Sequence, residues 1–375
     1  GDKEAMLKGS RLHRKIQKQM GSHYQAEVSL KKDTEYEDLI LRVEGRADGI
    51  FTQNEKICID EIKGVYKNLE LLAEPVLVHR AQALCYAWIY LDDHGLEEID
   101  VQMTYAHLDT EMIKRFRETM TREELESWYQ RLLDSYHKWL SYQMKWREER
   151  NRSMEKLEFP FIYRKGQKEM VAGIYHAISR KEQIFIQAPT GVGKTMSAVF
   201  PAVRSIGEGK AETLFYLTAR TITRTVAQDA FEILRKNGLL FKTVTITAKE
   251  KLCFCEKPEC NPETCPYAKG HYDRINDAVY ELWTNEQSFD RETILRQAEK
   301  WQVCPFEMSL ELSVWMDAVI CDYNYVFDPN VYLKRFFGEN ISGKYLFLID
   351  EAHNLVERGR EMYSASICLE DTIQI

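Results

Sequence analysis

A glycine-rich segment in the middle of the chain has the residue types of a phosphate-binding loop. Residues 188–195 read Ala-Pro-Thr-Gly-Val-Gly-Lys-Thr, in which Ala188 replaces the first glycine of the usual pattern. The glycines allow backbone N–H groups to turn toward phosphate oxygens, Lys194 would bind the β and γ phosphates, and Thr195 would ligate Mg²⁺. An apolar run at 184–186, expected as a strand, precedes the loop, and a helix is expected after it. The residues predicted to bind the nucleotide here are Gly191, Gly193, Lys194 and Thr195.

An acidic pair follows another apolar run, at residues 345–349. The sequence there is Asp350-Glu351-Ala352-His353, in which Asp350 would hold Mg²⁺ through water and Glu351 would polarise the attacking water. Alone, such a pair could be a helix N-cap, but the phosphate loop in the same chain favours a nucleotide site. Lys194 and Glu351 are the catalytic residues predicted for ATP hydrolysis, with His353 beside them.

A second set of candidate residues lies near the N-terminus, on two β-like runs at 43–51 and 56–63. Asp48 on the first run and Glu61 and Lys63 on the second would stand at the end of an apolar row, where charges are costly unless they bind something. The two carboxylates could share a divalent metal, and Lys63 could orient water or stabilise a pentavalent phosphate. The alternative is an exposed edge strand with a salt bridge.

The pairing of these runs decides whether the three side chains meet. With residues 52–55 as a hairpin loop, Phe51 would pair with Lys56, and Asp48 would then face Ile59. Opposed residues share a face, as do residues two apart on a strand. We therefore expect both carboxylates and the lysine on one face.

Three more residues, on helices before and after these strands, are candidates for the same site. His13 lies on an expected helix, and Gln82 and Tyr86 lie one turn apart on a later one. The order of all these residues resembles that of the RecB-like PD-(D/E)XK nucleases, over residues 5–108. The resemblance implies His13, Asp48 and Glu61 as metal ligands, Lys63 as catalytic, and Gln82 and Tyr86 as supporting residues.

The nucleotide motifs carry a resemblance of their own. Together they are similar to the first motor domain of superfamily 2 helicases, in particular the iron–sulfur XPD/DinG group, over about residues 159–375. The segment 163–167 resembles the part that contacts adenine, with Gln167 as the contact. The segment 217–221 resembles the motif that touches the DNA backbone, and Arg220 and Arg224 are candidates for that contact.

Five of the nine cysteines lie from Cys253 to Cys304, between the segment 217–221 and the acidic pair that begins at Asp350. They form no close CxxC pairs, which argues against a zinc ribbon, and their irregular gaps are compatible with an iron–sulfur cluster. Zinc and free thiols are the alternatives. The XPD/DinG resemblance implies a [4Fe–4S] cluster at this point. The predicted ligands are Cys253, Cys260, Cys265 and Cys304, with Cys255 as the alternative. Cys58 and Cys85 in the N-terminal region are expected to be core thiols without a cluster.

Composition bounds the class of protein. The chain has 375 residues, a net charge of −8, 44% hydrophobic and 29% charged residues. These values are typical of a globular protein and exclude a disordered chain, while no apolar run reaches the 18 residues of a membrane span. Net negative charge gives no bulk attraction to nucleic acid, so DNA must bind to local basic patches. The odd cysteine count favours a reducing cytoplasm.

The motifs and their spacing predict an α/β protein of several domains. The expected parts are a RecB-like PD-(D/E)XK nuclease domain at 1–108, a helical connector at 109–157 and a RecA-like motor domain at 158–375, with an iron–sulfur insertion at 250–310. Thr121 and Glu124 have the spacing of a capping box in the connector. An apolar stripe should face the core there: Trp128, Leu132, Tyr136, Trp139, Tyr142 and Trp146.

These expectations combine into an ATP-dependent DNA helicase with a metal-dependent nuclease, acting in DNA repair or DNA processing. Its cofactors would be ATP, Mg²⁺ or Mn²⁺ and a [4Fe–4S] cluster, and its partners single-stranded DNA and duplex junctions, without a membrane. Translocation would run 5′ to 3′. The second motor domain would lie beyond Ile375, so this chain alone should turn ATP over poorly. The alternatives are a non-catalytic DNA-binding nuclease fold, an RNA helicase and, more weakly, a CRISPR-associated effector.

Overall fold

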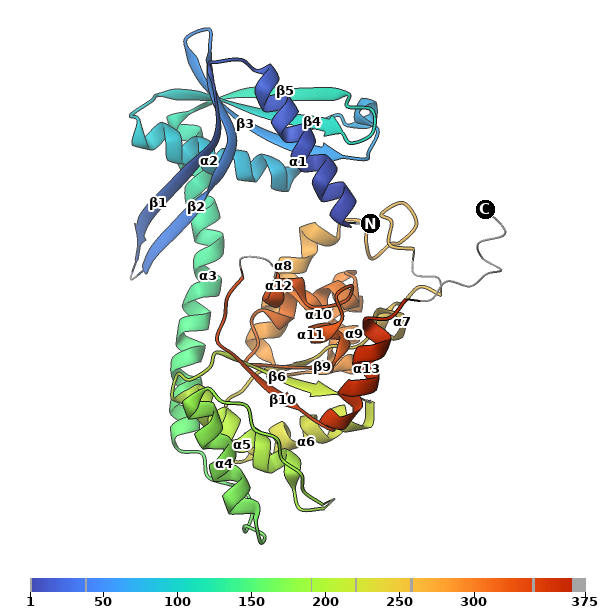
Figure 1. The fold of residues 1–375 in the computed structure, drawn as a ribbon. Helices are drawn as coiled ribbons and strands as arrows, with labels where there is room; N and C mark the ends of the chain where they lie inside the picture. Colours follow the sequence, from blue (N-terminus) through green and yellow to red (C-terminus); the bar gives the residue numbers. More distant parts are fainter. Residues whose placement is uncertain are drawn as a thin grey trace, which may run out of the picture. The chain divides into compact units, whose positions relative to one another are not determined.

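The chain forms two compact units, residues 1–138 and residues 139–375, each with its own sheet (Figure 1). The computed structural model describes residues 2–37, 39–189, 191–219, 221–256, 259–338 and 341–365. None of the helices it describes is long and apolar enough to cross a membrane. The N-terminal unit is longer than the 108 residues expected from the sequence.

The N-terminal unit is built on a five-stranded mixed sheet with the order β1-β2-β3-β4-β5. The strands are β1 (Tyr24–Tyr36), β2 (Leu39–Gln53), β3 (Lys56–Val65), β4 (Glu98–His107) and β5 (Ile113–Thr121). Only β3 and β4 are parallel, and helix α2 (Leu77–Asp93) connects them. The remaining elements are helix α1 (Asp2–Gln19) and the short helix η1 (Leu69–Leu71).

Helices α1 and α2 contact β3 side chains that point to opposite faces of the sheet. Leu12 and Ile16 of α1 pack with Ile62 and with Ala106 of β4. Lys63, the next residue on β3, points the other way and reaches the side chain of a glutamine on α2. The sheet is therefore covered by α1 on one side and by α2 on the other.

The hairpin between β2 and β3 is tighter than expected. Asn54 and Glu55 form a two-residue turn with φ angles of 51° and 64°, as type I′ turns require. Phe51 consequently pairs with Cys58, so the predicted pairing of Phe51 with Lys56 was wrong by two residues. A shift of two keeps every side chain on its face, and the expectation that the carboxylates and the lysine lie together survives the error.

The predicted all-helical connector was wrong in its first part. Residues 113–121 form β5, which pairs antiparallel with β4 over its whole length. Helix α3 (Arg122–Glu155) begins only after it. The capping box at that point is confirmed, because Thr121 N donates to Glu124 Oε2 at 2.9 Å and Glu124 N donates to Thr121 Oγ1 at 3.3 Å.

The aromatic stripe of α3 was predicted correctly only in its second half. Trp139 and Trp146 are buried, whereas Leu132 and Tyr136 are exposed by 38% and 49%. The residues buried in the first half are Leu125, Tyr129 and Leu133. The two halves of this helix belong to different compact units, so each half buries the face that its own unit contacts, and one apolar row does not describe both.

The C-terminal unit is a parallel α/β sandwich, as predicted. Its sheet has the order β10-β6-β9-β7-β8, and every pairing in it is parallel. The strands are β6 (Thr213–Thr218), β7 (Thr243–Thr245), β8 (Ser288–Phe289), β9 (Ala318–Asp322) and β10 (Tyr345–Ile349). Along β6, Phe215 and Leu217 pack into one apolar core while Leu214 and Tyr216 pack into another, so both faces are buried.

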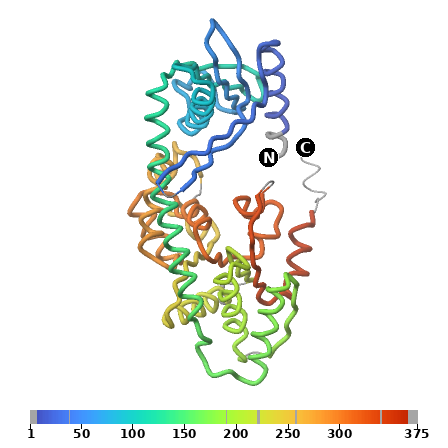
Figure 2. The backbone as a smooth tube through the Cα atoms, turned by 90° about the vertical axis from the view of Figure 1, so that its left-hand side faces the viewer, coloured from blue at the N-terminus to red at the C-terminus, as the bar shows by residue number. Residues whose placement is uncertain are grey.

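Helices cover both faces of this sheet (Figures 1 and 2). On one side lie α5 (Lys194–Gly207) and α6 (Thr221–Lys236), and on the other α8 (His271–Asn285), α9 (Arg291–Trp301) and α10 (Pro305–Ser313). The remaining helices are α4 (Gln167–Arg180), α7 (Lys249–Leu252), α11 (Asn324–Phe327), α12 (Lys334–Phe337), η2 (Ala352–Asn354) and α13 (Leu355–Met362).

Two strand predictions in this unit need correction. Residues 184–186 are not a strand: they pair with none of the described strands, and Phe185 is 88% exposed. The central strand β9 was missed, although its sequence Ala-Val-Ile-Cys-Asp is apolar. A short apolar run does not show whether a pairing partner exists, and pairing is what makes it a strand.

A buried ionic network joins α3 to this sheet within the C-terminal unit. Asp317, which is 3% exposed, accepts hydrogen bonds from Trp146 Nε1 at 3.1 Å and from the backbone N–H of Lys242 at 2.8 Å. It also forms an ion pair with Arg150, whose side chain is only 9% exposed. Loss of either ion would leave the other buried and unpaired.

We therefore expect Asp317→Ala to lower the free energy of unfolding by about 3–5 kcal/mol, the cost of an uncompensated buried charge. Glu148→Ala is the matched control, since it removes an exposed ion pair with Arg152 on the same helix and should cost less than about 1 kcal/mol. Chemical denaturation of both variants measures the difference. Equal effects would show that the buried network contributes nothing special.

Candidate functional site

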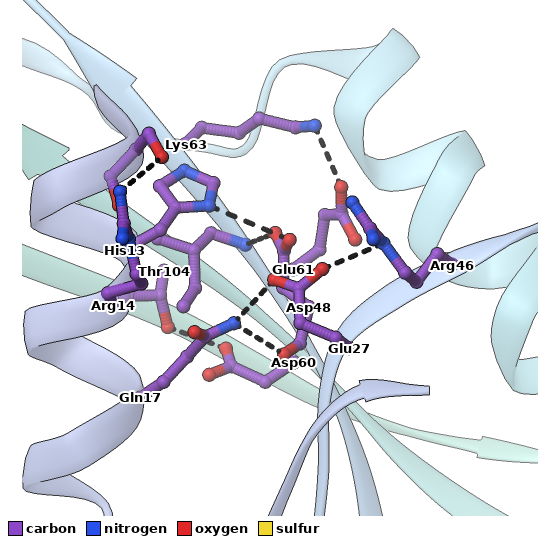
Figure 3. Close-up of polar contacts among 12 residues, drawn as sticks. His13, Arg14, Gln17, Glu27, Arg46, Asp48, Asp60, Glu61, Lys63 and Thr104 are labelled. Atoms are coloured by element: carbon purple, nitrogen blue, oxygen red, sulfur yellow. Dashed lines mark hydrogen bonds and ion pairs between the residues drawn. The ribbon is translucent and has the colours of Figure 1, made fainter. Parts of the chain in front are cut away.

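The candidate site of the N-terminal unit lies where β2 separates from β3. The backbone pairing of these strands ends at Gly49 and Asp60. One residue further on, the carboxylate of Asp48 accepts a hydrogen bond from the backbone N–H of Ile62 at 2.7 Å. A side-chain oxygen thus binds an N–H group that the separating strand leaves without a backbone acceptor, and this fixes Asp48 at the fork (Figure 3).

Glu61 lies beside Asp48 and is almost fully buried. Its side chain is 2% exposed, and burial, with the charge of Asp48 adding, raises its pKa to about 7. Oε1 accepts a hydrogen bond from Lys63 Nζ at 2.8 Å, while Oε2 has no hydrogen-bond partner among the described residues. A buried carboxylate oxygen without a partner costs free energy that a bound cation would recover.

Lys63 links the carboxylates to helix α2. Its ammonium donates to Gln82 Oε1 at 2.9 Å, and Gln82 Nε2 donates to Tyr86 Oη at 3.1 Å. Tyr86 passes directly over Gly45 of β2, where a Cβ atom would stand 2.6 Å from the tyrosine oxygen. Tyr86 thus holds Gln82, Gln82 holds the ammonium of Lys63, and glycine at position 45 makes room for the tyrosine ring.

His13 reaches the site from α1. Its Nδ1 atom lies 3.6 Å from Asp48 Oδ1, and Figure 3 shows it among Asp48, Glu61 and Lys63. Across the described ranges, no three His, Cys, Asp or Glu side chains are close enough to form a ready-made metal site. The donor types and the unpartnered Oε2 nevertheless suit a hard divalent cation, which prefers carboxylate oxygen and accepts imidazole.

Three residues of this site were missed by sequence reasoning. Gln17 donates to Glu27 Oε1 and to the carbonyl oxygen of Asp48, both at 2.9 Å, and Arg46 forms an ion pair with Glu27 at 2.7 Å. Gln17 stands one helical turn after His13, so its position on the same helix face was a usable signal. Glu27 had none, because it lies on a strand that carries no motif.

In the C-terminal unit, the predicted nucleotide residues come together. Lys194 Nζ lies 3.5 Å from Glu351 Oε1, which places the phosphate-loop lysine beside the acidic pair. Gln167 is buried next to Gly193, and its Oε1 accepts a hydrogen bond from the backbone N–H of Arg164 at 3.0 Å. Gly191 and Gly193 adopt φ angles of 81° and 78°, which glycine allows without strain. Thr190 lies outside the described residues.

The acidic pair is held by two tyrosines. The hydroxyl of Tyr216 hydrogen-bonds with Thr195 and Asp350, and Tyr323 Oη donates to the carbonyl oxygen of Glu351 at 3.1 Å. Burial, and then the neighbouring charge of Glu351, raises the pKa of Asp350. Glu351 itself has a φ of 51°, an uncommon value for this residue type.

His353 and Arg224, the latter a candidate for contact with the DNA backbone, differ in their exposure to solvent. His353 Nδ1 lies 3.4 Å from Glu351 Oε2, on a side chain that is 74% exposed. Arg224 is not a free surface residue, because it lies 3.8 Å from Asp322 and is 13% exposed. Arg220 lies outside the described residues.

Among the described residues, the five clustered cysteines do not come together as a complete set of cluster ligands. Cys255 Sγ lies 4.0 Å from Cys265 Sγ, and Cys304 precedes the first residue of α10. The backbone N–H of Cys304 donates to His271 Nδ1 at 3.2 Å, and Lys249 hydrogen-bonds with Cys260. Because Cys255 lies close to Cys265, Cys255 stays an alternative candidate for a cluster ligand. Cys58, by contrast, is fully buried, and burial raises its pKa to about 12, as a core thiol requires.

Two helicase family models match residues of the C-terminal unit. A DEAD/DEAH box helicase family model matches residues 164–259, and the DEAD_2 family model matches residues 236–372. The "Regulator of telomere elongation helicase 1 homolog" of Caenorhabditis briggsae is 23% identical over 270 residues, 58% of this chain and 27% of that protein. The "Fanconi anemia group J protein homolog" of Gallus gallus is 32% identical over 106 residues, 28% of this chain and 8% of that protein.

A solved structure titled "Truncated XPD" covers 55% of this chain and 58% of its own, at 20% identity and a TM-score of 0.39. This chain spans about a quarter of the length of the first curated relative and less of the second. The two family models follow one another across the phosphate loop, the cysteines and the acidic pair. Residues 164–372 thus match models of superfamily 2 helicases, the DEAD/DEAH box model over residues 164–259 and the DEAD_2 model over residues 236–372.

Proposed function

We propose that this chain belongs to an ATP-dependent DNA helicase of the XPD/DinG type that also cleaves DNA with its N-terminal PD-(D/E)XK unit. ATP hydrolysis would drive 5′ to 3′ movement on single-stranded DNA and separation of duplex junctions. Such an enzyme would act in cytoplasmic DNA repair or DNA processing. The match of the C-terminal unit to helicase family models supports the first activity, and the arrangement of the N-terminal site supports the second.

The observation that carries the nuclease proposal is the convergence of six predicted residues. They come from α1, β2, β3 and α2, and they meet at the fork: His13, Asp48, Glu61, Lys63, Gln82 and Tyr86. Chance placement of a solvated salt bridge would not bury Glu61 to 2% exposure and leave one of its oxygens without a partner. This arrangement favours a catalytic site over an edge strand with a salt bridge.

The residues divide the work of phosphodiester hydrolysis between them. Asp48 and Glu61, with His13, would hold a divalent cation, which supplies Lewis acidity and a water of lowered pKa. Lys63 stands 2.8 Å from Glu61, so its ammonium can donate to a phosphate oxygen and stabilise the charge that grows there. Gln82 fixes the direction of that ammonium at 2.9 Å, and Tyr86 fixes Gln82.

In the motor, the residues would bind ATP between the phosphate loop and the acidic pair. When ATP binds, Lys194 would leave its ion pair with Glu351 and bind the β and γ phosphates instead. Thr195 and Asp350, which both hydrogen-bond with Tyr216, would hold Mg²⁺. Glu351 is then free to polarise the attacking water. Gln167, already buried beside Gly193, would contact the adenine.

We expect Lys63→Ala to reduce metal-dependent cleavage of end-labelled single-stranded DNA by at least about 100-fold, since it removes a donor to the transition-state charge. The assay uses Mn²⁺ and follows product length on a gel. Lys56→Ala is the matched control: Lys56 lies on the same strand but pairs with Glu98 at 2.8 Å, so its loss should leave the rate within about twofold. A wild-type protein that binds Mn²⁺ but cuts nothing would support a non-catalytic DNA-binding module instead.

Lys194→Ala should weaken binding of a fluorescent ATP analogue by about tenfold or more, because a charge-assisted contact is worth about 1.5–3 kcal/mol. Lys168→Ala serves as its control, since Lys168 is an exposed lysine on the neighbouring helix α4. A titration with each variant measures the effect. Unchanged affinity in Lys194→Ala would remove the phosphate loop from the nucleotide site.

The cysteines would bind a [4Fe–4S] cluster through Cys253, Cys260, Cys265 and Cys304, with Cys255 as the alternative to one of them. Anaerobically purified protein should contain about four irons per chain, and Cys260→Ser should lose most of them, since thiolates hold such clusters. Cys85→Ser, in the other unit, should keep the iron. Zinc in place of iron would sink this assignment.

An RNA helicase is the second candidate, because the Asp-Glu-Ala-His sequence is common to DNA and RNA motors. Unwinding assays on matched DNA and RNA duplexes with single-stranded 5′ tails separate the two. We expect DNA to be the better substrate. Preference for RNA would overturn the DNA assignment and leave the ATPase assignment intact.

A further inference from the structure

A cavity of about 1110 Å³ opens beside the fork of the N-terminal unit. Its charged lining has an excess of basic groups: Arg14, Arg46 and Lys67 against Glu27 and Asp48, with His13 between them. A local basic excess is what the chain needs to attract a phosphate, because its net charge is −8. The question is which of these side chains is built to bind the phosphate.

The backbone of Glu27 departs from its strand at this cavity. Its φ angle is 57°, a left-handed value that residues with a side chain rarely adopt. The pairs Ala26–Gly49 and Val28–Ala47 continue the β1–β2 ladder on either side, but the ladder omits Glu27. Strained backbone of this kind persists only where the surroundings hold it, and it concentrates at functional sites.

Two side chains hold Glu27 in this conformation. Gln17 Nε2 donates to its Oε1 at 2.9 Å and also to the carbonyl oxygen of Asp48 at 2.9 Å. Arg46 Nε lies 2.7 Å from its Oε2. In the strand register Arg46 stands opposite Ser29, so its ion pair with Glu27 is a diagonal contact across the two strands.

From this geometry we infer that Arg46, held in place by Glu27, binds a backbone phosphate of the nucleic-acid strand next to the scissile bond. Arg46 precedes Asp48 by two residues on β2, and both line the cavity. Its guanidinium has five N–H donors, its Nε atom forms the ion pair with Glu27, and the side chain is 66% exposed. The two terminal nitrogens are those that bind phosphate oxygens in pairs.

Glu27 adds more than charge balance. A free arginine side chain must lose rotational freedom when it binds phosphate, whereas one already fixed by an ion pair loses less. Gln17 connects the same carboxylate to the backbone carbonyl of Asp48, so the group that holds Arg46 is fixed to the strand that carries the candidate metal ligand. Arg46 and Glu27 are binding and positioning residues, respectively. This inference rests on the proposed nuclease function for its substrate class.

The test uses the whole chain and compares two arginines in one digest. Arg42 is the matched control, since it lies on the same strand and pairs with Asp33 across the same hairpin at 2.7 and 2.8 Å, but it does not line the cavity. The protein is treated with phenylglyoxal in Ca²⁺, with and without a single-stranded oligonucleotide, and modification of each arginine is read by mass spectrometry. We expect the oligonucleotide to slow modification of Arg46 at least fivefold and that of Arg42 less than twofold. Equal protection of both, or of neither, would overturn the inference.

Two variants separate binding from folding. Glu27→Gly relieves the left-handed strain, so it should not lower the unfolding temperature, yet it should reduce the protection of Arg46 because the arginine is no longer held. In the cleavage assay, Arg46→Met should raise KM at least fivefold with a smaller change in kcat. If the wild type cuts nothing but Arg46 is still protected, the nuclease proposal fails and the phosphate subsite stands. If cleavage occurs with Arg46 unprotected, the subsite fails and the nuclease stands.

Discussion

The hydrogen bond from the Ile62 N–H to the Asp48 carboxylate is the interaction on which the N-terminal site depends. A sheet cannot open between two strands without leaving backbone groups unpaired, and a buried N–H without an acceptor is costly. Here the strand that separates supplies a side-chain acceptor in place of its carbonyl. The same contact brings Asp48 next to Glu61, a carboxylate that burial alone would disfavour. The fork, the acidic pair and the cavity thus all depend on one side-chain carboxylate that replaces a backbone carbonyl as hydrogen-bond acceptor.

The C-terminal unit positions its polar residues by other means. Its parallel sheet is buried on both faces, so the residues proposed to bind a nucleotide have room only at the carboxyl ends of the strands. The acidic pair follows β10 directly, and Tyr216 near the end of neighbouring β6 reaches Asp350 and Thr195. The residues of the phosphate loop and the acidic pair are far apart in sequence, and the order of the strands brings them together.

Residue spacing predicted which side chains share a face better than it predicted the strands. Gln82 and Tyr86 meet because helical spacing is rigid over one turn, and the carboxylate face survived a register error because strand faces repeat every two residues. His13 was suggested only by the resemblance to RecB-like nucleases. Pairing was the weak point. The sequence alone predicts helix at 113–121 and strand at 184–186, because neither segment reveals which other segment it will pair with. Glu27 could not be predicted at all, because its role comes from a backbone distortion set by Gln17 and Arg46.

The central claim is that the fork of β2 and β3 binds a divalent cation between two carboxylates. Titration of Mn²⁺ followed by electron paramagnetic resonance, in which the free ion gives the signal, tests it most directly. Asp48→Asn should lose a site that the wild type has, while Asp33→Asn, on the neighbouring strand and paired with Arg42, should keep it. Equal Mn²⁺ binding by all three proteins would contradict the account and reduce the fork to a structural ion pair.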